Sequence, residues 1–296
     1  MTLSRPRGLF AGLCTLDVEY LVEAFPGPDD KVIATEQLLA AGGPATNAAK
    51  TFAVLGGAAV LGTAVGDRDG LGTLLLDLVR KWSVDVIELT AGGESVPLSS
   101  VLVSGRSGER AVVSINATRA SVSAASVDKL PVTDCATLLV DGHHMDLALV
   151  AAQRARGAGV QVVFDGGSWK AGTERLLPFV DWAICSARFA PPGTAADPDA
   201  ILTYLQGAGV RGAAVTLGRD GARYATDGTR GSIEPRPVAT VVDTLGAGDV
   251  FHGATCYYLA TGASFVSALD SAAQHAGASC GYLGVDGWLQ QQQRAA

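Results

Sequence analysis

Residues 241–254 read VVDTLGAGDVFHGA, and no other stretch of the chain says more about the fold. The paired valines are typical of a strand, and the glycine-rich turn after them leads into a helical pattern. The backbone N–H groups of Gly246, Ala247 and Gly248 are therefore expected at a helix N-terminus, where the helix dipole favours an anion. Asp249 falls in the first turn of that helix, so its carboxylate is expected close to the anion site.

A carboxylate beside an anion site suits phosphoryl transfer. The carboxylate of Asp249 can accept a proton from an alcohol, while the N–H groups stabilise the charge of the phosphoryl group in transit. The same residues also fit an ordinary glycine turn in which Asp249 caps the helix. The rest of the chain has to decide between these two interpretations.

Outward from this stretch, apolar strand-like runs alternate with helical patterns, which predicts a mostly parallel α/β sheet flanked by helices. Two successive helices that break near Gly262 are expected between Gly246 and Cys280. Other helices are expected at residues 46–55, 71–82, 146–156 and 198–206. Strands are expected at residues 8–14, 58–65, 137–140, 160–164, 182–185 and 213–217.

Two segments do not fit this alternation. Residues 32–40 and 97–116 look extended, and the second is predicted to be a hairpin with its turn at residues 104–109. Both fall between strand–helix units, so they are expected to form a small protruding sheet that acts as a lid. The glutamines at 290–293 are expected to be a frayed tail.

Composition narrows the possible functions. The chain has 296 residues, a formal net charge of −7 and 37 glycines. The acidic balance argues against a nucleic-acid partner, and no apolar run reaches the ~18 residues of a membrane span. The five cysteines form no C-x-x-C pair, which fits free thiols in the cytoplasm. The glycine excess reflects either compositional drift or places where the backbone approaches a ligand closely.

Residues 243–249 resemble the second signature of the PfkB (ribokinase-like) carbohydrate kinase family, D-T-x-G-A-G-D. AGGPATNAAKTFAVLGG at residues 41–57 is similar to the family's first signature. GLCTLD at 12–17 resembles its first strand, which ends in a substrate-binding Asp, and VTLGRDG at 215–221 resembles its nucleotide-side turn. WSVD at 82–85 and CGYLGVDG at 280–287 look most like the ketohexokinase-like branch.

The resemblance extends in order and spacing over nearly the whole chain. It implies a ribokinase-like fold in a single domain over residues 1–296, with lid segments at about 15–40 and 95–120. Relatives with such lids often dimerise through them, so a homodimer is expected.

The resemblance also implies residue roles. Asp249 is the general base that activates the acceptor hydroxyl, and it forms the anion hole with Gly246, Ala247 and Gly248. Asp17 binds sugar hydroxyls, and the other sugar-side positions are Gly43, Asn47, Arg110, Asn116 and His143. The nucleotide-side positions are Ser186, Thr216, Gly218 and Gly221. Asp243 and the loop 284–287 lie where relatives bind a monovalent cation such as K⁺.

Several of these positions also have a plain structural interpretation. Asp17 could cap a turn, and Asn47 could be satisfied by the backbone at the start of its helix. Arg110 could simply be solvated after the hairpin turn, and His143 could be a structural histidine. An ordinary β-turn accounts for the glycines near residue 220.

Two positions depart from the family pattern. The family often carries N-x-x-E, whose Glu helps to hold Mg²⁺ through water, whereas Ser186 and Phe189 stand at the matching positions here. Pro44 stands where many members carry Lys or Asn, which removes one side-chain contact to the sugar. Metal handling and the identity of the sugar are therefore left open.

These observations predict a cytoplasmic kinase that uses ATP and Mg²⁺ to phosphorylate a hydroxyl of a ketose or ketose derivative. One alternative is a nucleoside kinase of the same fold, which a stacking aromatic in the lid would favour; residues 97–116 contain none. The other is a non-catalytic sugar-binding or regulatory protein, which the missing Glu would favour. No nucleic-acid or membrane partner is expected.

Overall fold

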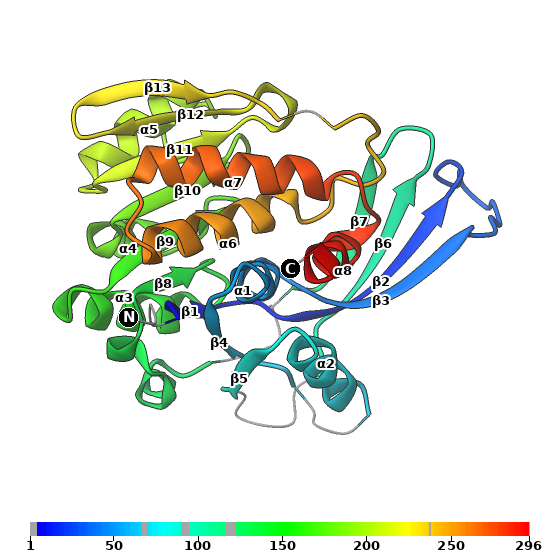
Figure 1. Ribbon diagram of the computed structural model, residues 1–296, viewed down its shortest axis with the longest axis horizontal. Coiled ribbons are helices and arrows are strands. Elements are labelled where there is room, and N and C mark those ends of the chain that lie inside the picture. Colours follow the sequence, from blue (N-terminus) through cyan, green and yellow to red (C-terminus); the bar gives the residue numbers. More distant parts are fainter. Residues whose placement is uncertain (1–4, 67–69, 90–94, 117–121, 237, 296) are drawn as a thin grey trace.

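The structure is a computed structural model that describes residues 5–66, 70–89, 95–116, 122–236 and 238–295. Its larger sheet has nine strands in the described part of the chain (Figure 1). Neighbouring strands pair in parallel except at one edge, where the last two strands add two antiparallel pairings. In spatial order they are β13 (Thr229–Ile233), β12 (Ala222–Thr226), β11 (Gly212–Thr216), β10 (Trp182–Ser186), β9 (Gln161–Gly166), β8 (Thr137–Val140), β1 (Arg7–Ala11), β4 (Ala58–Thr63) and β5 (Val84–Glu88).

Helices cover both faces of this sheet, because successive residues of each buried strand point to opposite sides. Phe10 and Leu139 belong to one apolar core, while their neighbours Leu9 and Leu138 belong to the other. The first core packs under α1 (Pro44–Val54), α2 (Leu71–Arg80), α6 (Ala247–Ala260), α7 (Phe265–Ser279) and α8 (Gly284–Ala295). The second packs under α3 (Met145–Gly157), α4 (Thr173–Leu176) and α5 (Pro198–Gly207).

Short 3₁₀ turns complete the helical structure; they are Ala124–Lys129, Val132–Asp134, Leu177–Phe179 and Gly218–Asp220. Among the described residues, no helix combines the length and apolar character needed to cross a bilayer.

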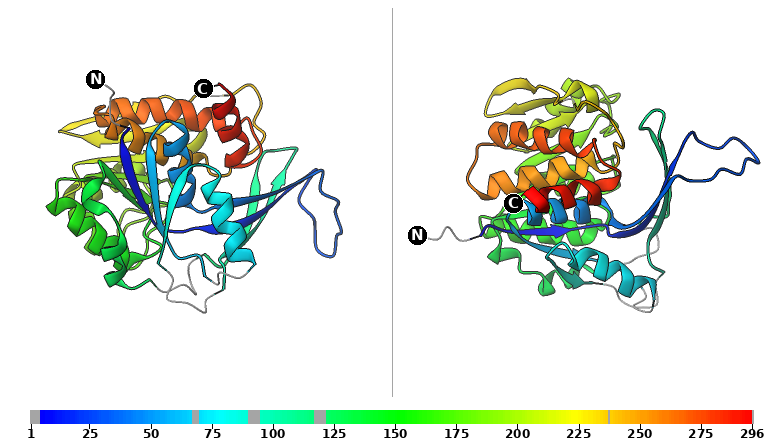
Figure 2. Two further views of the ribbon diagram at one scale, coloured as in Figure 1. Left: turned by 60° about the horizontal axis from the view of Figure 1, so that its bottom comes forward. Right: turned by 45° about the vertical axis from the view of Figure 1, so that its right-hand side comes forward.

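A second sheet projects from the edge of the molecule, as Figure 2 shows. It contains, in order, β3 (Glu36–Gly42), β2 (Thr15–Val22), β6 (Leu98–Ser104) and β7 (Arg110–Ser114). The predicted hairpin is confirmed, since Val103 pairs with Arg110 across the turn. Residues 32–35 lie outside the strand that was expected to begin at 32, and residues 117–120 of the expected lid lie outside the described residues.

The predicted first strand is too long by three residues. Strand β1 ends at Ala11, and Leu13 donates its N–H to the Asp141 side chain at 2.8 Å instead of to a neighbouring strand. The chain therefore leaves the large sheet, and Asp17 lies in β2 of the second sheet, not at the end of β1.

The expectation of a frayed C-terminal tail is wrong. Residues 290–293 continue α8, whose inner face buries Val285, Trp288 and Leu289 in the first core. A glutamine run carries no apolar signal of its own, and the apolar residues that hold this helix precede it. Both helices expected between Gly246 and Cys280 are present as α6 and α7.

Candidate active site

The turn before α6 has the geometry that its glycines suggest. Gly246 adopts the left-handed conformation (φ 70°), and a Cβ there would lie 2.2 Å from Cγ2 of Val285. The first helical hydrogen bond runs from Val250 N to Gly246 O at 2.9 Å, so the amides of the three residues before Val250 have no helical acceptor. A Cβ at Gly248 would meet nothing within 4 Å. The turn is therefore open beside Gly248, and its amides without helical acceptors make it a candidate anion site.

Asp249 stands in this first turn with a perturbed proton affinity. Burial first, and then the nearby Asp165 carboxyl, raise the pKa of Asp249 to about 6, against the influence of Asn47, His252 and Arg110. The Nδ2 group of Asn47 donates to Oδ2 of Asp249 at 2.8 Å. A carboxyl with this pKa is mostly ionised at neutral pH and can take up a proton there.

His252 and Asp165 lie next to the turn that carries Asp249, and the sequence analysis did not single them out. The Nδ1 atom of His252 lies 2.6 Å from Gly248 O and 3.5 Å from Oδ2 of Asp165. Its Nε2 atom lies 3.0 Å from Ile184 O. The available signal was spacing, because His252 follows Asp249 by one helical turn.

Asp17 lies on β2 with its carboxyl held from two sides. The hydroxyl of Thr15 donates to Oδ1 at 2.7 Å, and Ser99 of β6 supplies a second hydrogen bond. Burial raises the pKa of Asp17 above its ordinary value. Gly42 leaves room for this carboxyl, since a Cβ there would lie 1.8 Å from Oδ2 of Asp17. These contacts fix the orientation of the Asp17 side chain. None of them is a turn cap, which was the structural alternative for this residue.

Asp141 organises the backbone around Asp17 and Asn47. Its Oδ2 accepts from Leu13 N at 2.8 Å and from Ala45 N at 3.3 Å, and its Oδ1 accepts from His143 N at 3.0 Å. Gly43, the residue before α1, takes a positive φ of 97° and has no side chain to cap the helix. Asp141 at the end of β8 therefore supplies a hydrogen bond to the first turn of α1.

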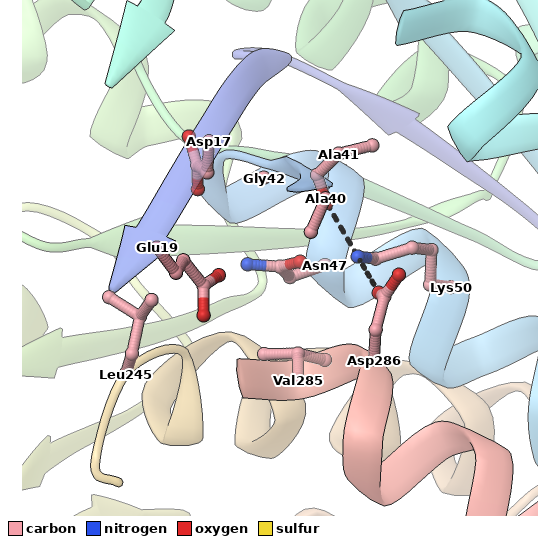
Figure 3. Close-up of a pocket in the computed structure, with 10 residues that line it drawn as sticks. All are labelled: Asp17, Glu19, Ala40, Ala41, Gly42, Asn47, Lys50, Leu245, Val285 and Asp286. Atoms are coloured by element: carbon pink, nitrogen blue, oxygen red, sulfur yellow. Dashed lines mark hydrogen bonds and ion pairs between the residues drawn. The ribbon is translucent and has the colours of Figure 1, made fainter. Parts of the chain in front are cut away.

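A small cavity lies between β2, α1 and the start of α8 (Figure 3). Asp17 and Asn47 line it, and so do Glu19 and Lys50, which the sequence analysis missed. Asp286 also lines it; the segment 284–287 that contains it was expected to be a loop, but it forms the first turn of α8. Glu19 and Lys50 could have been found from periodicity. Glu19 follows Asp17 by two residues on a strand, and Lys50 follows Asn47 by three residues on a helix, so each shares a face with a predicted site residue.

Lys50 is fully buried and bound to protein partners. Its Nζ donates to Ala41 O at 2.6 Å and to Oδ1 of Asp286 at 2.7 Å. Lys81 lies 2.9 Å from the other oxygen of Asp286, which also accepts from the indole N–H of Trp82 at 3.3 Å. Burial alone raises the pKa of Asp286, but Lys50 and Lys81 bring it below its ordinary value. This cluster joins α1 to α8 beneath the cavity.

The other three residues predicted to bind the sugar, Arg110, Asn116 and His143, lie outside the lining of the cavity. Arg110 of β7 donates to the carbonyl and hydroxyl oxygens of Thr244 at 3.2 and 2.8 Å, so the lid contacts the loop before α6. Asn116, in the turn after β7, has a positive φ of 49° and donates its N–H to the hydroxyl of Ser114. His143 is half-buried beside Asp141, and burial lowers its pKa. No hydrogen bond links Asn116 to the cavity lining in the described ranges.

The nucleotide-side predictions gather at the carboxyl ends of β10 and β11. Ser186 and Thr216 are register partners in these parallel strands. The hydroxyl of Ser186 donates to Gly167 O at 2.8 Å, and that of Thr216 donates to Cys185 O at 3.3 Å. Gly218 has a φ of 61° and open space around it, whereas a Cβ at Gly221 would strike Ile233 O at 2.1 Å. In parallel sheets this end is where ligands bind.

Two positions bear on metal ions. Asp243 accepts from Leu245 N at 2.8 Å and from Gly284 N at 2.9 Å, so its carboxylate ties the loop before α6 to the start of α8. Phe189 is fully buried against Phe164 and Trp169 and offers no ligand. Within the described residues, no group of three or more His, Cys, Asp or Glu side chains could hold a metal ion. The segment around Ser186 and Phe189 therefore does not fit a protein-held Mg²⁺.

Comparison with known proteins identifies the family. The family model described as pfkB family carbohydrate kinase matches residues 9–291. The chain belongs to this family. The expected enzyme class is thereby confirmed: the chain is an ATP-dependent carbohydrate kinase.

Individual relatives agree with this kinase family. Ketohexokinase of Mus musculus is 26% identical over 293 residues, which cover 94% of this chain and 97% of that protein. The ribokinase of Giardia lamblia superposes with a TM-score of 0.82 at 18% identity, covering 98% of each chain. The ribokinase of Arabidopsis thaliana in complex with ribose and ATP superposes with a TM-score of 0.73 at 19% identity, covering 98% of this chain and 99% of that one. The predicted ribokinase-like fold with its lid is confirmed.

Proposed function

We propose that this kinase transfers the γ-phosphoryl group of ATP to a hydroxyl of a ketose or a ketose derivative. The observation that carries the proposal is the half-buried Asp249, whose carboxyl is hydrogen-bonded to Asn47 and lies in the first turn of α6. The likeness to ketohexokinase over nearly the whole chain supports a ketose as the acceptor. The two sheets and their helices act as one domain over the chain.

The reaction follows from the placement of these groups. Asp17 and Asn47, with the backbone at Gly43, hold the sugar so that one hydroxyl faces Asp249. Asp249 accepts the proton of that hydroxyl as its oxygen bonds to the γ-phosphorus and the bond from phosphorus to the bridging oxygen of ADP breaks. The amides of Gly246, Ala247 and Gly248 take up the charge of the transferring group. Arg110 and Asn116 of the lid and His143 of the turn after β8 are proposed to contact the sugar as it enters.

ATP is proposed to lie across the carboxyl ends of β10 and β11, with its adenosine near Ser186, Thr216, Gly218 and Gly221. Magnesium arrives bound to the phosphates of ATP, because Mg²⁺ keeps water and phosphate ligands in preference to an all-protein cage. A monovalent cation such as K⁺ is proposed near Asp243, held by backbone oxygens where the loop before α6 meets the start of α8. Comparing turnover in K⁺ with turnover in a bulky organic cation tests that site.

The assembly and the compartment are proposed on other grounds. Apolar side chains are exposed on the lid and its loop, among them Phe25, Ile33, Val112 and Val113. We expect a second copy to cover them in a homodimer. All five cysteines are free in the structure, which supports a reducing cytoplasm.

The decisive experiment is an ATP-consumption screen over ketoses, aldoses and nucleosides, with Asp249→Asn as the paired variant. We expect turnover of at least one ketose, a loss of at least about a hundredfold in the variant, and unchanged ATP binding by calorimetry. Retained activity in Asp249→Asn would disprove the assigned base. Preferred turnover of a nucleoside would replace the ketose proposal.

A further inference from the structure

Lys50 is a buried base that the proposed reaction does not use. It lies on α1, one helical turn after Asn47, whose amide donates to Oδ2 of Asp249 at 2.8 Å. The side chain of Lys50 is 0% exposed, and its Nζ donates to Ala41 O at 2.6 Å and to Oδ1 of Asp286 at 2.7 Å. Figure 3 shows both contacts, which place the ammonium group between the end of β3 and the first turn of α8.

The first turn of α8 also packs against the turn before α6. A Cβ at Gly246 would lie only 2.2 Å from Cγ2 of Val285. Gly284 donates its N–H to Oδ2 of Asp243 at 2.9 Å, and Oδ1 of the same carboxylate accepts from Leu245 N at 2.8 Å. The position of α8 therefore limits where the turn before α6 can lie.

Asp286 connects these two sets of contacts. Its carboxyl binds Lys50, lies 2.9 Å from Nζ of Lys81 and accepts from the indole N–H of Trp82 at 3.3 Å. The contacts form a ring, because α1 reaches the turn before α6 through Asn47, that turn packs on α8, and α8 returns to α1 through Asp286 and Lys50. Apolar side chains of similar volume often stabilise a core as well as a buried ion pair does, but they lack its directed hydrogen bonds.

We propose that Lys50 and Asp286 are positioning residues for phosphoryl transfer, whose ion pair holds α8 where the turn before α6 keeps the Asp249 carboxyl against the Asn47 amide. The inference rests on the proposed function, in which Asp249 is the base, and adds the residues that hold this base in place. A displacement of about 1 Å at a reacting group can slow a reaction ~100-fold. Loss of the ion pair should therefore lower kcat, with KM for ATP unchanged.

The test compares Asp286→Asn with the double variant Lys50→Met/Asp286→Asn and uses Asp128→Asn as the matched control. Asp128 also forms an ion pair, with Arg154, but both side chains are exposed. Asp286→Asn leaves the Lys50 charge buried without its carboxylate, whereas the double variant removes both charges, so the double variant should melt at the higher temperature of the two. We expect kcat to be lower by about tenfold or more in both. The control should behave like the wild type.

The titration of the Asp249 carboxyl provides a readout that does not need turnover. It is followed by ¹³C NMR on the intact protein without substrate, beside the pH profile of kcat/KM. The Asn47 hydrogen bond lowers the pKa of Asp249, so a weaker bond should raise this pKa and move the acid limb of the profile to higher pH. The substitutions leave in place the other ionisable groups that interact with this carboxyl, which are Asp165, His252, Arg110, Asp17 and His143.

These readouts separate the inference from the proposed function. If the wild type phosphorylates no sugar, the proposed function fails, while the NMR titration still tests the role of the ion pair. A double variant in which Asp249 titrates as in the wild type would overturn the inference, and so would a kcat that recovers together with the melting temperature. If Asp286→Asn does not fold, the double variant decides by the same two readouts.

Discussion

Asp249 illustrates how single residues set the chemistry of this site. The residue is half-buried; its carboxyl accepts from the Asn47 amide and is influenced by Asp165 and by His252 of the next helical turn. Burial and Asp165 disfavour the charged form, whereas Asn47 and His252 favour it. The pKa that results, about 6, leaves the carboxylate available as a base at neutral pH.

This balance predicts the pH dependence of activity. A base must be unprotonated to act, so kcat/KM should fall by about tenfold per pH unit below the pKa of Asp249. Asp165→Asn removes a negative charge, lowers the pKa of Asp249 and should move this acid limb to lower pH. His252→Asn removes the opposing influence and should move the limb to higher pH. Profiles of kcat/KM over about pH 5 to 8 measure both shifts. Limbs that move the same way in both variants would contradict the electrostatic account.

At the scale of elements, the site depends on segments that approach one another closely. The end of β3 passes the Asp17 carboxyl of β2 at Gly42, and α1 begins at once after Gly43. Asp141 binds the chain after β1 and the first turn of α1 to the end of β8. Gly12 and Gly42 have no room for a side chain at these contacts. A Cβ at Gly12 would lie 2.2 Å from Oδ2 of Asp141, and a Cβ at Gly42 would overlap the Asp17 carboxyl.

Gly42→Ala tests the close approach at the sugar site. The new Cβ would overlap the Asp17 carboxyl and force it away, so KM for the sugar should rise about tenfold or more while KM for ATP stays constant. Gly157→Ala is the control, because that glycine ends α3 in open space. The control should keep the wild-type KM and gain up to about 1 kcal/mol of stability. Steady-state kinetics and thermal melts check both variants, and a wild-type sugar KM in Gly42→Ala would refute the steric argument.

At the scale of the whole molecule, the lid carries the two most exposed large apolar side chains of the described residues. Ile33 is 88% exposed in the loop between β2 and β3, and Val113 is 76% exposed on the edge strand β7. An edge strand with exposed valines is a surface on which another chain can pair. The projecting sheet in Figure 2 is therefore the place where a second copy is expected.

We predict that the protein is a dimer that Val113→Asp or Ile33→Asp weakens at least tenfold. The physical reason is that a carboxylate would be buried in an apolar contact without a partner. Leu71→Asp, at an exposed apolar position outside the lid sheet, is the control and should leave the dimer intact. Light scattering across a dilution series measures the dissociation constant. A monomeric wild type at micromolar concentration would rule the lid dimer out.

Particular residues show how far the sequence predicted this arrangement. The glycine turn and Asp249 stand out because they are adjacent in the chain, and the hairpin at 98–114 follows from local alternation and turn residues. Glu19, Lys50 and Asp286 come from three distant segments, so no local pattern joins them before the chain folds. Likewise, nothing local states that Leu13 binds Asp141, 128 residues away, and thereby ends β1 early.

Local sequence is enough to predict the alternation of strands and helices, the lid segments and the kinase turn, because each depends on residues within a few positions of one another. The folded arrangement settles which acids share the cavity, which of their pKa values burial raises, and which cation is already bound. Those properties depend on burial and on distances between segments far apart in the chain. The placement of Glu19 beside Asp17 and opposite Lys50 is the clearest case, since its unpaired oxygen exists only in the folded protein.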